Sequence, residues 1–269
     1  MPPVSIANSA QPAPFTPHWT KGNMSYFGGP LIQNIQVYPL WWGEARFQSK
    51  LEVFYNQFVA HCPMIDWIRT DYSTPRPLQI ISRGKGHKGR SLKGYPKKKY
   101  LIDVKDLHPY LLQLVKTGFL KPTPNTYFPI HFAQGVSITI NNAGTLVTSC
   151  DYFDGVHTTL NITSLRIPDA PYLYYGILPD CGHAFDVTTN VASHEVVEAI
   201  TDPAAGLARA NLVPDALPPA FPIAWNDRAA MEVGDLCADA VDWFKGTDGV
   251  RYQVQGVWSN SRMRCRGVE

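Results

Sequence analysis

The chain has 269 residues, of which 45% are hydrophobic and 17% are charged, and its formal net charge is +2. This balance is typical of a globular protein and argues against a disordered one, and the length fits one or two domains. The small net charge points to no class of partner, and no apolar run reaches the roughly 20 residues that a membrane-spanning helix needs.

The first 20 residues are rich in Pro, Ala and Ser, and we predict that they form a flexible arm. They lack the basic start and apolar block of a secretory signal peptide, so we expect a cytoplasmic protein or one secreted by another route. Residues 21–269 are predicted to form a single domain.

The chain then mixes strand-like and helix-like patterns. β-branched and aromatic residues predict a strand at 32–43, and the spacing of Leu51, Phe54 and Phe58 predicts an amphipathic helix over 47–62. Further strands are expected at 78–83, 126–132, 136–142, 144–153 and 171–178, with short ones near 252–260, and further helices at 104–118 and 187–201. This order predicts an α+β (or α/β) fold with a mixed sheet.

Residues 83–99 differ from the rest because they are rich in glycine and in basic side chains. The basic residues are Arg83, Lys85, Lys88, Arg90, Lys93, Lys97, Lys98 and Lys99. We predict a flexible, solvated insertion loop. The alternative is contact with an anionic partner such as a nucleic acid, a phosphate group or a charged surface.

The motif "ASHEVVEAITDP" at 192–203 carries the strongest chemical signal. His194 and Glu198 are four residues apart and face the same side of a helix, whereas Glu195 is rotated by about 100°. This is the arrangement of the HExxH metalloprotease helix, with Glu in place of the second His. There the two facing residues bind a metal ion and the intervening Glu takes a proton from water. The alternative is an ordinary amphipathic helix with Glu residues on its wet face near its start.

A third metal ligand is expected from "MEVGDLC", where Glu232 and Asp235 flank Gly234. We expect Glu232 to bind the ion and Asp235 to support it, with Gly234 allowing a sharp turn. One imidazole favours Zn²⁺, although two carboxylates also suit Mn²⁺ or Ca²⁺. Asp202 lies at the negative end of the helix dipole, so we expect a partner for it: a backbone donor, a basic side chain or a second, structural cation.

The motifs "NVASHEVVEAITDP", "MEVGDLCAD", "VQGVWSNSRMRC" and "FGGPLIQNIQVYPLWWG" resemble a family of bacterial and fungal HExxE zinc metalloproteases. A looser similarity runs to the plant phosphate-induced, exordium-like proteins. The resemblance covers most of residues 25–265. It implies a zincin-like fold with His194 and Glu198 as ligands and Glu195 as base. Many of the relatives are secreted.

The resemblance also singles out His157 in "DGVHTT", at the position of the family's Gly-Tyr-His, where Val156 replaces the Tyr. It implies that His157 donates to a developing oxyanion or is the third ligand; the alternative is a buried His that serves backbone groups. It further implies two disulfides, Cys150–Cys181 and Cys237–Cys265, which leaves Cys62 free.

These features predict a metal-dependent hydrolase, a zinc endopeptidase that acts on protein or peptide substrates. The alternative is a non-catalytic protein on the same fold, stabilised by a cation and acting as a wall or signalling component.

Overall fold

The computed structural model describes residues 24–142, 145–205, 223–227 and 231–269, so the predicted N-terminal arm lies outside the described residues. The α-helices are α1 (Gln48–His61), α2 (Met64–Tyr72), α3 (His108–Lys116) and α4 (Phe185–Thr201). Short helical turns lie at Asp103–Leu107, Thr163–Leu165 and Asp235–Cys237. The strands of the first half are β1 (Ser25–Tyr26), β2 (Asn34–Val37), β3 (Leu40–Trp42), β4 (Thr74–Pro75), β5 (Leu78–Gln79), β6 (Ser82–Gly86), β7 (Arg90–Ser91), β8 (Tyr100–Ile102) and β9 (Thr126–Phe132). Those of the second half are β10 (Ser137–Asn142), β11 (Thr145–Thr148), β12 (Val156–Asn161), β13 (Tyr172–Leu178), β14 (Trp225–Asn226), β15 (Val241–Lys245), β16 (Arg251–Gln255), β17 (Val257–Ser259) and β18 (Arg264–Arg266).

A mixed sheet of seven strands forms the centre of the fold. Its main order is β12-β13-β9-β2-β6, with β3 paired to β9 and β7 paired to β3. Only β12 runs antiparallel to its neighbour. The strand predicted at 32–43 is divided into β2 and β3 at Tyr38 and Pro39, and both halves pair with β9. Proline has no backbone N–H for the ladder, which accounts for the break.

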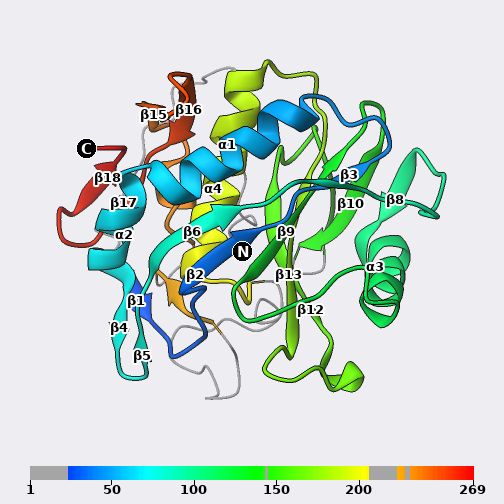
Figure 1. Ribbon diagram of the computed structural model, residues 1–269, viewed down its shortest axis with the longest axis horizontal. Coiled ribbons are helices and arrows are strands. Elements are labelled where there is room, and N and C mark those ends of the chain that lie inside the picture. The colour runs from blue at the N-terminus through cyan, green and yellow to red at the C-terminus, as the bar shows by residue number, and fades with distance from the viewer. Residues whose placement is uncertain (1–23, 143–144, 206–222, 228–230) are drawn as a thin grey trace.

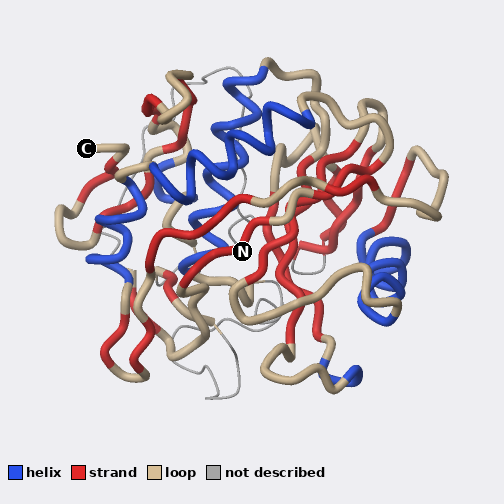
Figure 2. The backbone as a smooth tube through the Cα atoms, in the orientation of Figure 1, coloured by secondary structure: helices blue, strands red, loops and turns tan. Residues whose placement is uncertain are grey.

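Helices cover the central sheet on one face, and a smaller sheet with α3 covers the other (Figures 1 and 2). One core cluster joins α1, α2 and α4 to Val37, Tyr127, Tyr174 and Leu178 of the sheet. The other cluster joins α3 to Phe128, Ile130, Tyr175 and Ile177 on the opposite side. Strand β9 is buried along its whole length because it lies between these two cores. The prediction of an α+β fold with a mixed sheet is confirmed.

Several predicted elements differ from the structure in detail. Helix α2, which follows Pro63 directly, was not predicted, because nine residues are too few for a clear helical period. The helix expected at 104–118 begins as a π-helical turn and becomes α-helical at His108. The strand expected at 78–83 is two strands in different sheets, β5 and β6. The strand expected at 144–153 ends at Thr148.

The prediction of a flexible insertion loop at 83–99 is wrong for its first half. Residues 82–86 form β6, which pairs in parallel with β2, and Arg90–Ser91 pair with β3. A Cβ at Gly84 would lie 2.1 Å from the carbonyl oxygen of Ile35, and one at Gly86 would lie 2.3 Å from the backbone nitrogen of Asn56. The glycines therefore allow β6 to pass closely between β2 and α1, which is a packing role that composition alone does not reveal.

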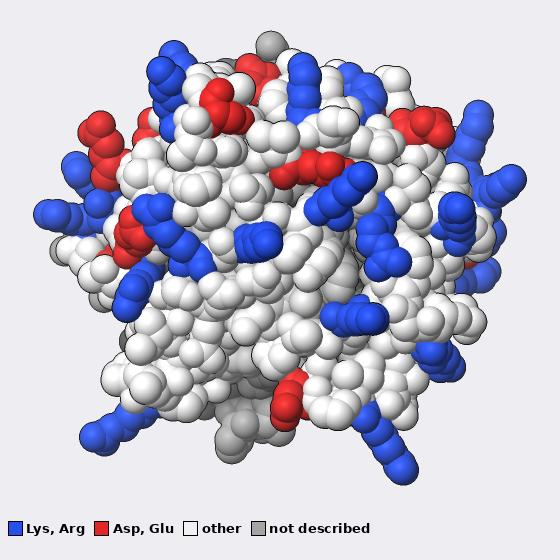
Figure 3. All heavy atoms as spheres, viewed as in Figure 1, with Lys and Arg blue, Asp and Glu red and all other residues white. Residues whose placement is uncertain are grey.

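Three basic side chains of this segment have partners within the protein. Arg83 pairs with Asp66 at 2.6 Å, Lys98 pairs with Asp106 at 2.6 Å, and Arg90 lies over the ring of Phe119. On the face drawn in Figure 3, Lys and Arg side chains are spread out rather than gathered in one patch. Binding of an anionic partner through 83–99 stays a prediction.

Both disulfides implied by the resemblance are present. Cys150 is bonded to Cys181 and Cys237 to Cys265, and Cys62 is free and buried. The second bond holds the turn that contains Asp235 against the C-terminal strands. Among the described residues, no helix is both long and apolar enough to cross a membrane.

Candidate metal centre

Helix α4 carries His194, Glu195 and Glu198 through the interior of the protein. It begins at Phe185, so the three polar residues lie in its second half and not at its start. All three side chains are 0% exposed, and the interpretation of a wet helix face is therefore wrong. The neighbouring apolar residues, such as Val191, Val196 and Ile200, are buried as well, as expected for a helix segment enclosed on all sides.

Glu198 is held by the backbone of the turn at Asp235–Cys237. Its Oε1 accepts hydrogen bonds from the backbone nitrogens of Gly234 and Asp235, both at 3.1 Å. Its Oε2 lies 3.1 Å from Nε2 of His194. A Cβ at Gly234 would lie 2.7 Å from Nδ1 of His194. Gly234 has an ordinary helical φ of −80°, so it is needed for its missing side chain and not, as predicted, for a sharp turn.

Asp235 repeats the arrangement of Glu198. Its Oδ2 accepts a hydrogen bond from the backbone nitrogen of Glu232 at 3.2 Å, and its Oδ1 lies 3.9 Å from Nε2 of His194. Ligand atoms of His194, Glu198 and Asp235 lie within 4.8 Å of one another. The buried Gln255 fixes this turn by donating to the carbonyl oxygen of Gly234 at 2.8 Å. Two carboxylates thus each use one oxygen for the backbone and turn the other toward the same imidazole nitrogen.

His157 approaches the same Glu198 oxygen from β12. Its Nδ1 lies 3.4 Å from Oε2 of Glu198 and 3.6 Å from Oε2 of Glu195. Its Nε2 donates to the carbonyl oxygen of Asp202 at 3.1 Å and lies 3.1 Å from Oε1 of Glu232. Glu232 thus contacts the ring nitrogen of His157 that faces away from Glu198. It belongs to neither of the two groups of cluster residues that could hold an ion, which are His194, Glu198 and Asp235, and His157, Glu195 and Glu198. This contact suits a residue that orients His157. The role of Glu232 as the third ligand stays a prediction.

Glu195 is the least satisfied group of the cluster. Neither of its carboxylate oxygens has a hydrogen-bond partner among the described residues, although both are fully buried. The nearest basic atoms are Nδ1 of His157 at 3.6 Å and Nε2 of His194 at 3.9 Å. Burial raises the pKa of Glu195 above its usual range. A carboxylate in this state is a candidate proton acceptor.

The charges of the cluster require a cation or bound protons. Glu195 and Glu198 are fully buried, and their ion-pair contacts among the described residues are with His157 and His194. Burial alone lowers the pKa of His194, but Glu198 and Glu195 outweigh it and raise this pKa to about 10. A buried carboxylate without a cation is strongly unfavourable. The donor set of imidazole and carboxylate therefore fits a divalent metal ion.

Asp202 has a hydrogen-bond partner at each of its two carboxylate oxygens. Its two oxygens accept hydrogen bonds from the backbone nitrogen of Ala224 at 2.9 Å and from the amide of Asn226 at 2.6 Å. The predicted backbone donor is confirmed, and an amide supplies the other bond. Burial and the nearby Glu232 raise the pKa of Asp202 to about 7. A second, structural cation near Asp202 stays a prediction.

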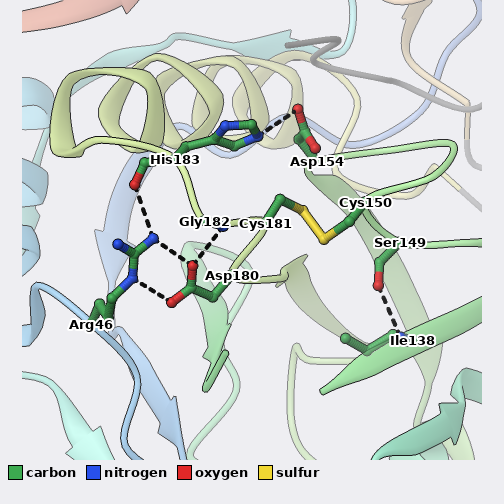
Figure 4. The surroundings of a disulfide bond; sticks show 9 residues. All are labelled: Arg46, Ile138, Ser149, Cys150, Asp154, Asp180, Cys181, Gly182 and His183. Carbon is green, nitrogen blue, oxygen red and sulfur yellow. Dashed lines mark hydrogen bonds and ion pairs between the residues drawn. A yellow bond between two sulfur atoms is a disulfide. The ribbon is translucent and has the colours of Figure 1, made fainter. Parts of the chain in front are cut away.

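A small surface cavity is lined in part by Cys181 of the Cys150–Cys181 disulfide. Figure 4 shows the surroundings of this disulfide. The volume of the cavity is about 30 Å³ and its wall includes Val191, one helical turn before Glu195. On the same wall Arg46 pairs with Asp180 at 2.5 Å, and His183 pairs with Asp154 at 3.2 Å. Because Cys181 is bonded to Cys150, its sulfur is not available as a third ligand beside Asp154 and His183.

Comparisons with protein-family models, with curated proteins and with solved structures found no match. Of the predicted site residues, the structure brings together His157, His194, Glu195, Glu198, Glu232 and Asp235, from three separate parts of the chain. Sequence reasoning missed Gln255 and Tyr127, which are single polar residues in strand patterns and carry no motif.

Proposed function

We propose that this chain is a zinc-dependent hydrolase of the HExxE metalloprotease type, an endopeptidase with a zincin-like fold. The supporting observation is the buried cluster in which one ligand atom each of His194, Glu198 and Asp235 lies within 4.8 Å of the others. These three residues would hold the ion, and a catalytic zinc site with three protein ligands keeps one open position. The ion would supply Lewis acidity.

Glu195 would act as the base that takes a proton from the attacking water and later gives it to the leaving amine. Its two oxygens have no hydrogen-bond partner among the described residues, so no internal bond has to break first. His157 faces Glu195 at 3.6 Å and would share its proton. Glu232 would keep the His157 ring in place, as carboxylates do for histidines around metal ions.

Elemental analysis of the purified protein and one variant test this proposal. We expect one zinc ion per chain, and we expect Glu195→Gln to lower kcat on a casein or peptide substrate by roughly 10²–10⁴-fold. The variant should keep its zinc and its melting temperature, because the amide has the shape of the carboxylate. Glu44→Gln, at an exposed site, is the matched control and should be unchanged. Protein without a metal ion, or an active Glu195→Gln variant, would contradict the proposal.

One observation favours a second candidate function, a non-catalytic extracellular protein stabilised by a cation. Every side chain of the cluster is at most 8% exposed, whereas a peptidase must admit a peptide. Two disulfides suit such a protein, because they persist in oxidising compartments. In that case zinc removal would lower the melting temperature, and no peptide or protein substrate would be cleaved by the zinc-loaded protein.

A further inference from the structure

The hydroxyl of Tyr127 is a second buried polar group near the cluster with no hydrogen-bond partner among the described residues. Tyr127 lies on β9 and is 0% exposed. A buried hydroxyl left without a partner destabilises a folded protein, and such a group is a candidate for a functional role. The equally buried hydroxyl of Tyr55, on α1, has a partner, because it forms a hydrogen bond with Nε2 of His131 at 2.8 Å.

The Tyr127 side chain leans across the sheet toward β12. Its hydroxyl oxygen occupies the space above Gly176, where a Cβ would lie only 2.2 Å from it. Gly176 is the direct cross-strand partner of His157. Tyr127, Gly176 and His157 therefore follow one another on the face of the sheet that α4 covers. Because Gly176 has no side chain, the Tyr127 hydroxyl can lie above it, next to the residue that pairs with His157.

This placement puts an unpaired donor next to the cross-strand neighbour of His157, and His157 in turn lies 3.6 Å from Glu195, an unpaired acceptor. Burial, and after it the charge of Glu195, raise the pKa of Tyr127 well above its usual range, so the hydroxyl keeps its proton. Glu195 offers two oxygens without hydrogen-bond partners among the described residues. A molecule between the two groups would satisfy both, if it donates to Glu195 and accepts from Tyr127.

His157, for which the resemblance implies donation to an oxyanion, is poorly placed for that task. Its Nε2 donates to the carbonyl oxygen of Asp202. Its Nδ1 faces two carboxylates at 3.4 and 3.6 Å, so a proton on this nitrogen would point to Glu198 or Glu195 and not to a substrate. Any hydrogen bond to the developing negative charge would therefore have to come from a different side chain.

We propose, on the basis of the hydrolase function above, that the Tyr127 hydroxyl is the donor that stabilises the oxyanion in the reaction assisted by Glu195. Water attacks the carbonyl carbon of the peptide bond, and its proton passes to Glu195. The electron pair of the C=O bond moves to the oxygen, which accepts the hydrogen bond from Tyr127. When the C–N bond breaks, the electron pair returns to the carbonyl, and the amine leaves with the proton from Glu195.

The test compares Tyr127→Phe with Tyr174→Phe in zinc-loaded protein. Tyr174 is the matched control, because it is a buried tyrosine on the same sheet face and pairs with Tyr127 across β9 and β13. We expect Tyr127→Phe to lower kcat about 10²–10³-fold, with KM and zinc content unchanged. Its melting temperature should stay equal or rise, because the variant removes an unpaired buried hydroxyl. Tyr174→Phe should retain the wild-type kcat.

Binding of acetohydroxamate, a small oxyanion probe, gives a reading that does not depend on turnover. Calorimetry should show affinity about 10-fold lower or more in Tyr127→Phe, the size expected for one hydrogen bond to a charged group. Gly176→Ala, which pushes the hydroxyl away, should reproduce this loss. Unchanged kcat and unchanged hydroxamate affinity in Tyr127→Phe would overturn the role of Tyr127 while leaving the hydrolase proposal standing. Protein that takes up no metal would overturn both.

Discussion

Nε2 of His194 lies 3.1 Å from Oε2 of Glu198, one helical turn further along α4, and both residues are buried. The other Glu198 oxygen is fixed by two backbone N–H groups of the 234–235 turn. This contact therefore aims one oxygen of a buried carboxylate and one imidazole nitrogen at the same region. Asp235 completes the set from the turn itself.

The first prediction concerns the third ligand. Asp235 directs Oδ1 toward His194, whereas Glu232 contacts the far nitrogen of His157. We expect Glu232→Gln to weaken zinc binding by roughly 10- to 100-fold, the usual effect of a residue that orients the centre, and Asp235→Asn to weaken it more. Competition titration with a chelating dye measures both. A larger loss of zinc affinity in Glu232→Gln than in Asp235→Asn would identify Glu232 as the ligand.

The second prediction concerns the glycine-rich strand β6. Gly86→Ala should destabilise the protein by about 1–3 kcal/mol or more, because its Cβ would overlap the backbone of α1 at Asn56. Gly94→Ala is the matched control: it meets no atom within 4 Å, and only its φ of +68° opposes a side chain. Urea unfolding measures both. Equal, small effects would mean that β6 does not depend on close contact with α1.

The third prediction concerns pH. Burial lowers the pKa of His131 to about 3. Between pH 6.5 and pH 3, His131 is therefore protonated in the unfolded chain but neutral in the folded protein. This group therefore lowers stability as the pH falls from 6.5 toward 3, by up to about 1.4 kcal/mol per pH unit. His131→Gln keeps an acceptor for Tyr55 but cannot titrate, so its stability should fall less steeply. Urea unfolding at pH 7, 5.5 and 4.5 measures the slopes. The exposed His61→Gln is the control, and equal slopes in all three proteins would refute the prediction.

The fourth prediction separates the two disulfides. Each closes a loop of similar length, with sequence separations of 31 and 28, so removal of either by a double Cys→Ala change should destabilise the protein by about 3–4 kcal/mol. Only loss of Cys237–Cys265 should also weaken zinc binding markedly, because Cys237 ends the turn that begins at Asp235. Equal zinc affinity in the two double variants would show that the bond does not position the ligand.

The sequence by itself determined the elements whose signals are local. The spacing in 192–203 predicted a helix with His194 and Glu198 on one face, and α4 confirms it. The apolar runs at 126–132 and 171–178 predicted β9 and β13 with the observed bounds or one residue more. The α+β class followed from their order. Helical and strand periods arise from neighbouring residues, so a short stretch of chain contains the information.

Only the tertiary structure decided which groups meet. It placed Glu232 next to His157 and Asp235 near His194, because the path of a turn depends on what packs around it. It turned the first part of the basic segment into sheet strands, since the backbones of β2 and α1 leave no room for a side chain at Gly84 and Gly86. It also buried the whole HExxE face and set Tyr127 above Gly176. Such contacts join residues far apart in the chain, and no local period encodes them.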